Sequence, residues 1–151
     1  MAVTATPIFG QTPNRSGALW VAGTTANTRN DGVGTVGTDI LLAYTAGANG
    51  AYIDRIRLHP VGLVASTLTT ATVGRVYLST IASGATTATN TKLWQEVACP
   101  AQTSSQATVG TSPVEIPMGI RLKASDTILF SMHHAAAANT GWQVNVIATD
   151  F

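Results

Sequence analysis

Apolar and polar positions alternate most clearly in residues 51–62, AYIDRIRLHPVG. Successive side chains of an extended chain point to opposite faces of the sheet that contains it. One expected face holds Tyr52, Ile56 and Leu58, and the other holds Arg55, Arg57 and His59. The segment is therefore predicted to be a β-strand with one face buried and the other in water.

A tight turn is expected just before this strand. Asn49-Gly50 is a dipeptide that supplies the positive backbone angles of a hairpin turn. The strand is therefore predicted to fold back on residues 38–45 and to pair with them.

Seven further segments carry strand-forming residues and are separated by turn-forming clusters. The eight predicted strands are residues 16–25, 39–45, 51–62, 72–81, 91–99, 113–122, 127–134 and 141–148. The polar stretches 26–37 and 83–90 are predicted to be loops. Pro117 cannot donate a ladder hydrogen bond, so its strand is expected at a sheet edge or broken near the proline.

The alternation also assigns inner and outer faces. The side chains expected in a single core are Ile56, Leu58, Val76, Leu78, Ile116, Phe130, Trp142 and Val144. Two sets are expected to share an apolar face, namely Ile40 with Leu42 and Tyr44, and Leu93 with Val97 and Cys99. The side chains expected to point outward include Arg75, Tyr77 and Trp94.

Eight strands without an amphipathic helical stretch are typical of an all-β sandwich or barrel. The sequence is predicted to form an eight-stranded antiparallel β-sandwich, and a jelly roll fits this strand count best. An up-and-down barrel and an immunoglobulin-like sandwich satisfy the same pattern. Residues 1–15 contain two prolines and no sustained period, so they are expected to form an extended N-terminal arm before a single domain at residues 16–151.

Length and composition narrow the functional classes. A chain of 151 residues is long enough for one well-packed domain. The single cysteine, Cys99, rules out an intramolecular disulfide framework. The N-terminus lacks a basic region followed by an apolar run, so no signal peptide is expected and synthesis in the cytoplasm is predicted. No apolar window is long enough for a membrane span.

Charged residues are scarce. They make up 10% of the chain, and the net charge is +1, whereas an ordinary soluble domain contains about 25% charged residues. Without a cluster of basic residues there is no electrostatic pattern for nucleic-acid binding. A weakly charged chain also repels copies of itself less, which favours dense packing and a structural role.

Candidate catalytic and metal sites are weak. His133 and His134 are adjacent on a predicted strand and would point to opposite faces, so with His59 they are not expected to hold one metal ion. Cys99 is expected to be a buried, unreactive thiol. No cofactor and no enzymatic activity are predicted.

A paired-carboxylate glycosidase site is the main enzymatic alternative. It would combine Asp54 with Glu96, Glu115 or Asp126, but these acids are scattered singly along the chain. Non-catalytic glycan binding would need an exposed aromatic platform, for which Trp94 is the candidate. Arg55, Arg57 and Arg75 are expected to form a small basic patch only if their strands are neighbours.

Several packing motifs recur in a known group of proteins. They are YIDRIRLHPVG, ATVGRVYLSTIASG, NTKLWQEVACPA, VEIPMGIRLKASDTILFSM and TGWQVNVIATDF. In this order they resemble small virion proteins encoded in the structural gene clusters of tailed bacteriophages. The resemblance covers roughly residues 51–151.

The resemblance implies a jelly-roll capsid decoration, or cement, protein that binds the outer surface of a phage head and stabilises it. The implied partners are the major capsid protein and further copies of the chain, as a homotrimer or alternatively a dimer, without nucleic acid or membrane. The implied location is the outer surface of the virion. The resemblance carries no catalytic residues.

The N-terminal arm is the segment expected to contact the shell or a neighbouring subunit. Ile8 and Phe9 form an apolar pair between two prolines, and Arg15 ends the arm. Extended segments of this kind bind by adding a strand or by filling a groove. The alternative function is a non-catalytic receptor- or glycan-binding module of a phage fibre or a lectin.

Overall fold

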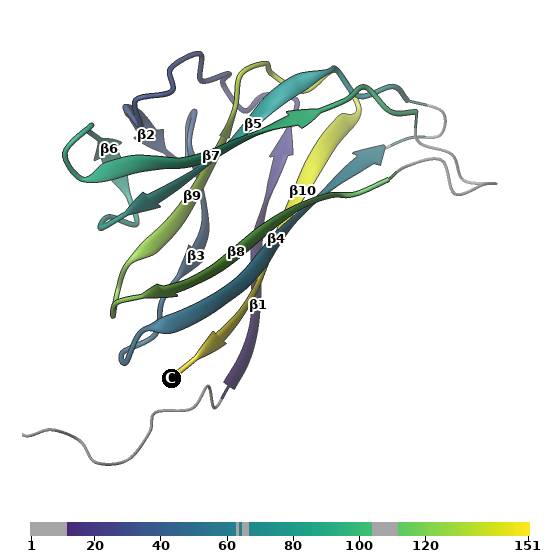
Figure 1. Cartoon of the computed structure of the whole chain (residues 1–151). Coiled ribbons are helices and arrows are strands. Elements are labelled where there is room, and N and C mark those ends of the chain that lie inside the picture. Colours follow the sequence, from purple (N-terminus) through teal and green to yellow (C-terminus); the bar gives the residue numbers. More distant parts are fainter. Residues whose placement is uncertain (1–11, 63, 65–66, 104–111) are drawn as a thin grey trace, which may run out of the picture.

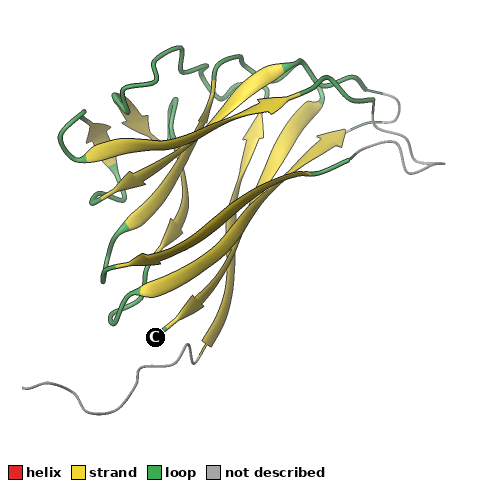
Figure 2. Ribbon diagram, viewed as in Figure 1, coloured by secondary structure: helices red, strands yellow, loops and turns green. Residues whose placement is uncertain are grey.

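The computed structural model describes residues 12–62, 64, 67–103 and 112–151. This part of the chain contains ten β-strands and no helix (Figure 2). The strands are β1 (Thr12–Val21), β2 (Gly34–Val36), β3 (Leu41–Thr45), β4 (Ala51–Gly62), β5 (Thr72–Ser79), β6 (Gly84–Thr86), β7 (Thr91–Cys99), β8 (Val114–Leu122), β9 (Thr127–Met132) and β10 (Thr140–Asp150).

Two four-stranded sheets make up most of the fold. The first sheet has the order β1-β10-β4-β8, and the second has the order β3-β9-β5-β7. Every pairing within them is antiparallel. Figure 1 shows the two sheets as separate layers. The prediction of an all-β protein built from antiparallel sheets is therefore confirmed.

The strand count differs from the predicted eight. β2 and β6 pair with each other in a separate two-stranded sheet. They lie in residues 26–37 and 83–90, which were predicted to be loops. Three residues are too few to display an alternating pattern, so these strands leave no periodic signal in the sequence.

Side chains from both four-stranded sheets share one apolar core. Of the side chains expected in this core, those buried in it are Ile56, Leu58, Val76, Ile116, Phe130, Trp142 and Val144. Leu78 is partly buried and packs against the cluster. Trp20 of β1 also lies fully inside, and its ring meets that of Phe130 edge to face at 6.4 Å.

The turn at Asn49-Gly50 does not form the predicted hairpin. Gly50 has a φ of 89°, and its N–H donates to the Gly47 carbonyl, so the chain does turn here. However, β3 pairs with β9 in the second sheet, whereas β4 pairs with β10 and β8 in the first. A turn reverses the chain locally without deciding its hydrogen-bonding partner. The prediction of pairing between residues 38–45 and 51–62 is therefore wrong.

Irregularities in strand pairing change the predicted faces of three strands, β4, β3 and β7. In β4 a shift at Asp54 places Ile53 in the core, whereas Tyr52 is exposed. An extra residue on one strand moves the later side chains to the opposite face. Tyr52 was predicted on the buried face, and the irregularity is the reason for the error.

The same effect divides the apolar residues of β3 and β7. A shift between Leu42 and Tyr44 places Tyr44 in the main core, while Leu42 packs with Ile40 in a second, small cluster. A shift in the pairing of β5 with β7 places Leu93 opposite Tyr77, and Leu93 is exposed. Ile40 and Leu42 therefore share a face as predicted, and so do Val97 and Cys99, whereas the faces predicted for Tyr44 and Leu93 are wrong.

The outer face of the second sheet is covered over β5 and β9, whereas most side chains of β7 at its edge are exposed. Tyr77 is fully buried there with Ile40 and Leu129. Arg75 is also buried, and its guanidinium donates to the Asn27 carbonyl at 2.8 Å. The segment between β1 and β3 therefore lies over this face, and the outward orientation predicted for Arg75 and Tyr77 does not expose them to water.

The bounds of β1 and the position of β8 also test the sequence predictions. Thr12–Val21 is a strand along its whole length, so residues 12–15 belong to β1 and not to the predicted arm, and residues 1–11 lie outside the described residues. β8, which contains Pro117, is at the edge of the first sheet, so the predicted edge position is confirmed.

Within the described residues, no helix is long and apolar enough to cross a membrane.

Asp150 ties the end of β10 to the opposite sheet. Its carboxylate accepts hydrogen bonds from the Tyr44 hydroxyl and, at 2.9 Å, from the Asn14 amide. Burial acts to raise the pKa of Asp150, but the bonds from Tyr44, Asn14 and the backbone of Gly47 outweigh it, so the pKa is lowered. Burial, reinforced by the bond to Asp150, raises the pKa of Tyr44.

The core can be tested by truncation. Phe130→Ala and Trp142→Ala should each lower the free energy of unfolding by about 3–5 kcal/mol, because each removes a large buried ring and leaves a cavity. Trp94→Ala is the matched control, since this ring is 44% exposed. Denaturant melts measure the effect, and a loss below ~1 kcal/mol in both core variants contradicts the packing.

The Asp150 contacts predict a pH dependence. A carboxylate whose folded pKa is lowered stabilises the fold above its unfolded pKa of about 3.9, and this contribution is lost as the pH falls through the folded value. Asp150→Asn should therefore destabilise the protein at pH 7 by about 1–3 kcal/mol, as for bonds to charged groups. The difference from wild type should shrink in melts as the pH falls below the unfolded pKa of about 3.9 and through the lower folded value.

The control for this prediction is Asp54→Asn, which alters an exposed ion pair and should change stability little. A constant difference between Asp150→Asn and wild type from pH 7 to pH 2 would show that the charge of Asp150 plays no part.

Candidate functional site

The outer face of the first sheet is left open by the described loops. The outward side chains of its strands are mostly exposed, in contrast to the covered outer face of β5 and β9. We call this surface the arginine face. Its charged and exposed apolar members are Arg15, Leu19, Tyr52, Asp54, Arg55, Arg57, Glu115, Arg121 and Ile147.

The register of the sheet arranges these side chains in rows. One row crosses all four strands from Arg15 through Ile147 and Arg55 to Pro117. Neighbouring strands are about 4.8 Å apart, so such a row spans about 14 Å. In a parallel row, Tyr52 of β4 lies opposite Arg121 of β8. Residues distant in the sequence thus form one continuous surface.

Four of the six arginines of the chain lie on this face. Two are neutralised by neighbours: the Arg55 Nε lies 2.6 Å from an Asp54 carboxylate oxygen, and the Arg57 Nε lies 2.9 Å from one of Glu115. Within the described residues, Arg15 and Arg121 have no carboxylate at ion-pair distance. The face therefore carries excess positive charge at its two edge strands.

Apolar groups interrupt the charges. Leu19, Tyr52 and Ile147 are among the most exposed large apolar side chains of the described chain. The Arg121 guanidinium lies 5.8 Å from the centre of the Phe151 ring. Arginine and tyrosine are enriched at the centres of protein interfaces. The surface is therefore suited to a protein partner.

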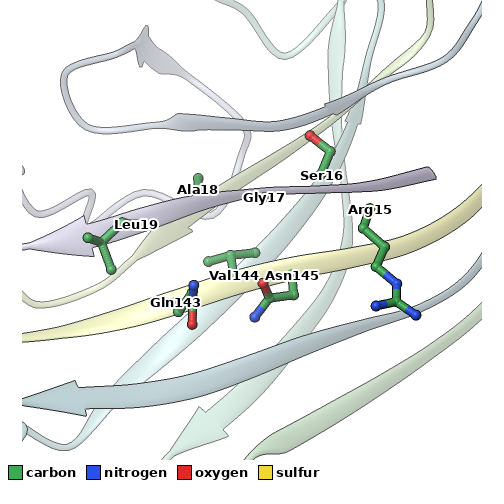
Figure 3. Close-up of a pocket in the computed structure, with 8 residues that line it drawn as sticks. All are labelled: Arg15, Ser16, Gly17, Ala18, Leu19, Gln143, Val144 and Asn145. Atoms are coloured by element: carbon green, nitrogen blue, oxygen red, sulfur yellow. The ribbon is translucent and has the colours of Figure 1, made fainter.

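A hollow of about 360 Å³ lies between β1 and β10 on this face (Figure 3). Gly17 forms its floor, with Arg15 and Leu19 on β1 and Gln143 and Asn145 on β10 around it. Figure 3 shows Arg15 extending across β10 and Leu19 lying beside β1, while Ser16 and Ala18 point the other way. The hollow is thus a gap in a row of outward side chains, where glycine contributes none.

Close approach of the two strands explains the glycine. A Cβ atom added at Gly17 would lie 2.0 Å from the Val144 carbonyl oxygen, far inside van der Waals contact. Any larger residue would force β1 away from β10. The missing side chain of Gly17 therefore permits strand pairing at this position and also opens the hollow.

The residues predicted to contact a shell or a subunit are only partly described. Ile8 and Phe9 lie outside the described residues. Arg15 lies in β1, opposite Ile147, and belongs to the arginine face. The sequence pattern placed Arg15 at the end of an arm, whereas the structure places it on a sheet beside a hollow.

The histidines do not form a common site. His133 and His134 follow β9, and their rings meet edge to face at 4.7 Å. The His133 Nδ1 lies 3.3 Å from a guanidinium nitrogen of Arg75, so it is engaged in the contacts of that arginine. His59 lies on β4, in the other sheet. In the part of the chain that is described, no group of three metal-ligating side chains is found.

The candidate nucleophile Cys99 and the candidate basic residue Arg75 are both held within the fold. Cys99 is buried in the main core, and burial raises its pKa to about 11. A thiol with so high a pKa carries almost no thiolate at neutral pH. Arg75 pairs with Glu96 at 2.7 Å in the second sheet, so the conditional patch with Arg55 and Arg57 does not form.

The candidate acids are divided between the sheets. Asp54 and Glu115 line a hollow of about 290 Å³ together with Arg55 and Pro117, and each acid pairs with an arginine. The other two candidate acids, Glu96 and Asp126, lie on the second sheet and in the turn before β9.

Of the tryptophans, Trp20 and Trp142 are buried and Trp94 is exposed.

Sequence reasoning missed the arginine face as a unit. The alternation identified Arg55 and Arg57 as outward residues, but only the pairing of β10 between β1 and β4 brings Arg15 to the same surface. The available signal was the outward position of each arginine on its own strand. That signal does not show which strands are neighbours, because strand pairing depends on contacts between residues far apart in the sequence.

Comparison with known proteins gives no assignment. No protein-family model matches the chain, and neither a curated protein nor a solved structure matches it.

Proposed function

We propose that this chain is a structural protein of a bacteriophage virion that binds the outer surface of the head and stabilises it. Its partners would be the major capsid protein and further copies of itself, without nucleic acid or membrane. The observation that carries the proposal is the open arginine face, a broad sheet surface with the composition of a protein interface.

The sheet topology supports a jelly roll. Without the short strands β2 and β6, the eight remaining strands number one to eight along the chain. The first sheet then has the order 1-8-3-6, and the second has the order 2-7-4-5. This order is expected of two interlocked Greek keys, an arrangement used by viral capsid and lectin domains. It agrees with the fold that the sequence resemblance implies.

A non-enzymatic role fits the surroundings of the reactive groups. The Cys99 thiol is buried, His133 contacts the buried Arg75, and the two acids that share a hollow, Asp54 and Glu115, are each paired with an arginine. Each of these groups has a structural partner or environment that accounts for its position. Binding through a surface therefore explains the fold better than catalysis.

Edge strands supply a route to the proposed homotrimer, with a dimer as the alternative. β1 is an edge strand of ten residues, and such an edge pairs readily with another chain. β8, at the opposite edge, contains Pro117, which cannot donate a ladder hydrogen bond. Lateral contacts between copies are therefore expected at β1 rather than at β8.

Shell binding tests the function directly. Purified protein mixed with heads assembled without it should co-sediment in a fixed copy ratio, and imaging should show it on the outer surface at local symmetry axes. Binding should also raise the temperature at which the heads release DNA, because a ligand that binds only the intact state stabilises that state. Absence of co-sedimentation at micromolar protein contradicts the proposed function.

The segment before β1 gives a second prediction. Ile8 and Phe9 lie outside the described residues, and their sequence context predicts that they bind a neighbouring subunit or the shell. Deleting residues 2–11, which leaves β1 intact, should keep the melting temperature of the isolated protein nearly unchanged. It should weaken shell binding by about tenfold, or 1.4 kcal/mol. Equal binding by both forms would assign the contact to the folded domain alone.

Glycan binding is the second candidate function. The observation that favours it is the exposed ring of Trp94 on β7, since aromatic side chains provide platforms for sugars. Binding of the isolated protein to a glycan array, abolished by Trp94→Ala, would support a receptor-binding module of a phage fibre or a lectin.

A further inference from the structure

We propose that the hollow over Gly17 is the centre of a docking site for an acidic protein surface, in which Arg15 binds a carboxylate side chain of the partner. The inference rests on the proposed function, because it specifies the chemistry of the shell surface that the arginine face would meet. It goes beyond that function by naming the contact and the ligand group.

The lining of the hollow favours an anion. Its outward polar side chains are those of Arg15, Gln143 and Asn145. No carboxylate lines it, and none pairs with Arg15 within the described residues. A guanidinium offers two parallel N–H donors that match the two oxygens of a carboxylate. The nearby amides of Gln143 and Asn145 are further donors.

The surroundings favour a protein as the source of the carboxylate. Leu19 borders the hollow and Ile147 lies beside Arg15, and both are exposed apolar groups that a protein surface could cover. A nucleic acid would need several phosphate contacts, but only Arg15 and Arg121 lack a carboxylate partner on this face. These two arginines are on opposite edge strands, separated by the width of the sheet.

The other arginines of the face are less available. Arg55 and Arg57 are held by Asp54 and Glu115, so recruiting them would require breaking existing ion pairs. Those acids would also repel an acidic partner from the centre of the β4–β8 side. The charge pattern therefore directs an acidic partner toward the β1–β10 side, where the hollow lies.

Nuclear magnetic resonance titration with hexaglutamate tests the site without any shell. In the wild type, shifts should be confined to the backbone amides of Gly17, Gln143 and Asn145 and to the Arg15 Nε–H. Arg15→Gln should weaken binding by about tenfold, since it removes the guanidinium and keeps a side chain of similar length. Arg29→Gln is the matched control, because it removes an equal charge from an exposed arginine elsewhere and should leave binding unchanged.

Three outcomes overturn the proposal. The first is no localised shift at low salt, and the second is equal weakening by Arg15→Gln and Arg29→Gln. The third is tighter binding of a deoxythymidine hexanucleotide or of phosphatidylserine vesicles than of hexaglutamate at the same salt concentration. Unchanged melting temperatures of both variants ensure that the comparison reports binding and not folding.

Binding assays with heads distinguish a failure of this inference from a failure of the proposed function. If wild type binds heads and Arg15→Gln binds about tenfold more weakly, both are supported. If wild type and Arg15→Gln bind heads equally, the docking site is wrong and the proposed function stands. If wild type binds no heads, the proposed function fails, and the hexaglutamate titration alone decides whether the hollow is an acid-binding site.

Discussion

The hydrogen-bonded register of β10 is the constraint on which the rest of the structure depends. This strand lies between β1 and β4, and buried side chains alternate with more exposed ones from Trp142 to Thr149. Trp142, Val144 and Val146 enter the core, while Gln143 and Asn145 face outward. A slip of one residue would exchange the two sets and place tryptophan and valine in water. The core and the arginine face are therefore two consequences of one pairing.

Regular alternation explains what could be predicted from the sequence. β4 has the predicted bounds, and Ile116, Phe130 and Val144 occupy the core because their strands keep period two across the relevant residues. The all-β class followed from the same pattern. Where a strand is irregular, as at Asp54, the face was predicted wrongly on the N-terminal side of the irregularity, at Tyr52, because strict alternation does not allow for the extra residue of a bulge.

Contacts between distant segments explain what could not be predicted. Arg75 has the sequence pattern of a wet face, yet it lies under the segment between β1 and β3, where the Asn27 carbonyl, Glu96 and His133 satisfy its guanidinium. Three polar partners, contributed from three regions of the chain, make burial of this cation tolerable. No local pattern indicates such a cluster. The same limitation hid the arginine face, whose members come from the two edge strands and the two central ones.

Folding and binding place different demands on the two key residues of the hollow. Gly17 serves both, since its missing side chain allows β1 to approach β10 and also opens the space above the strands. Any change there alters the pairing of an edge strand together with the surface. Arg15 is separable, because its side chain is exposed and makes no ion pair in the described part of the chain. Stability therefore constrains the shape of the hollow through Gly17, while the charge of Arg15 beside it can change without breaking an ion pair of the described chain.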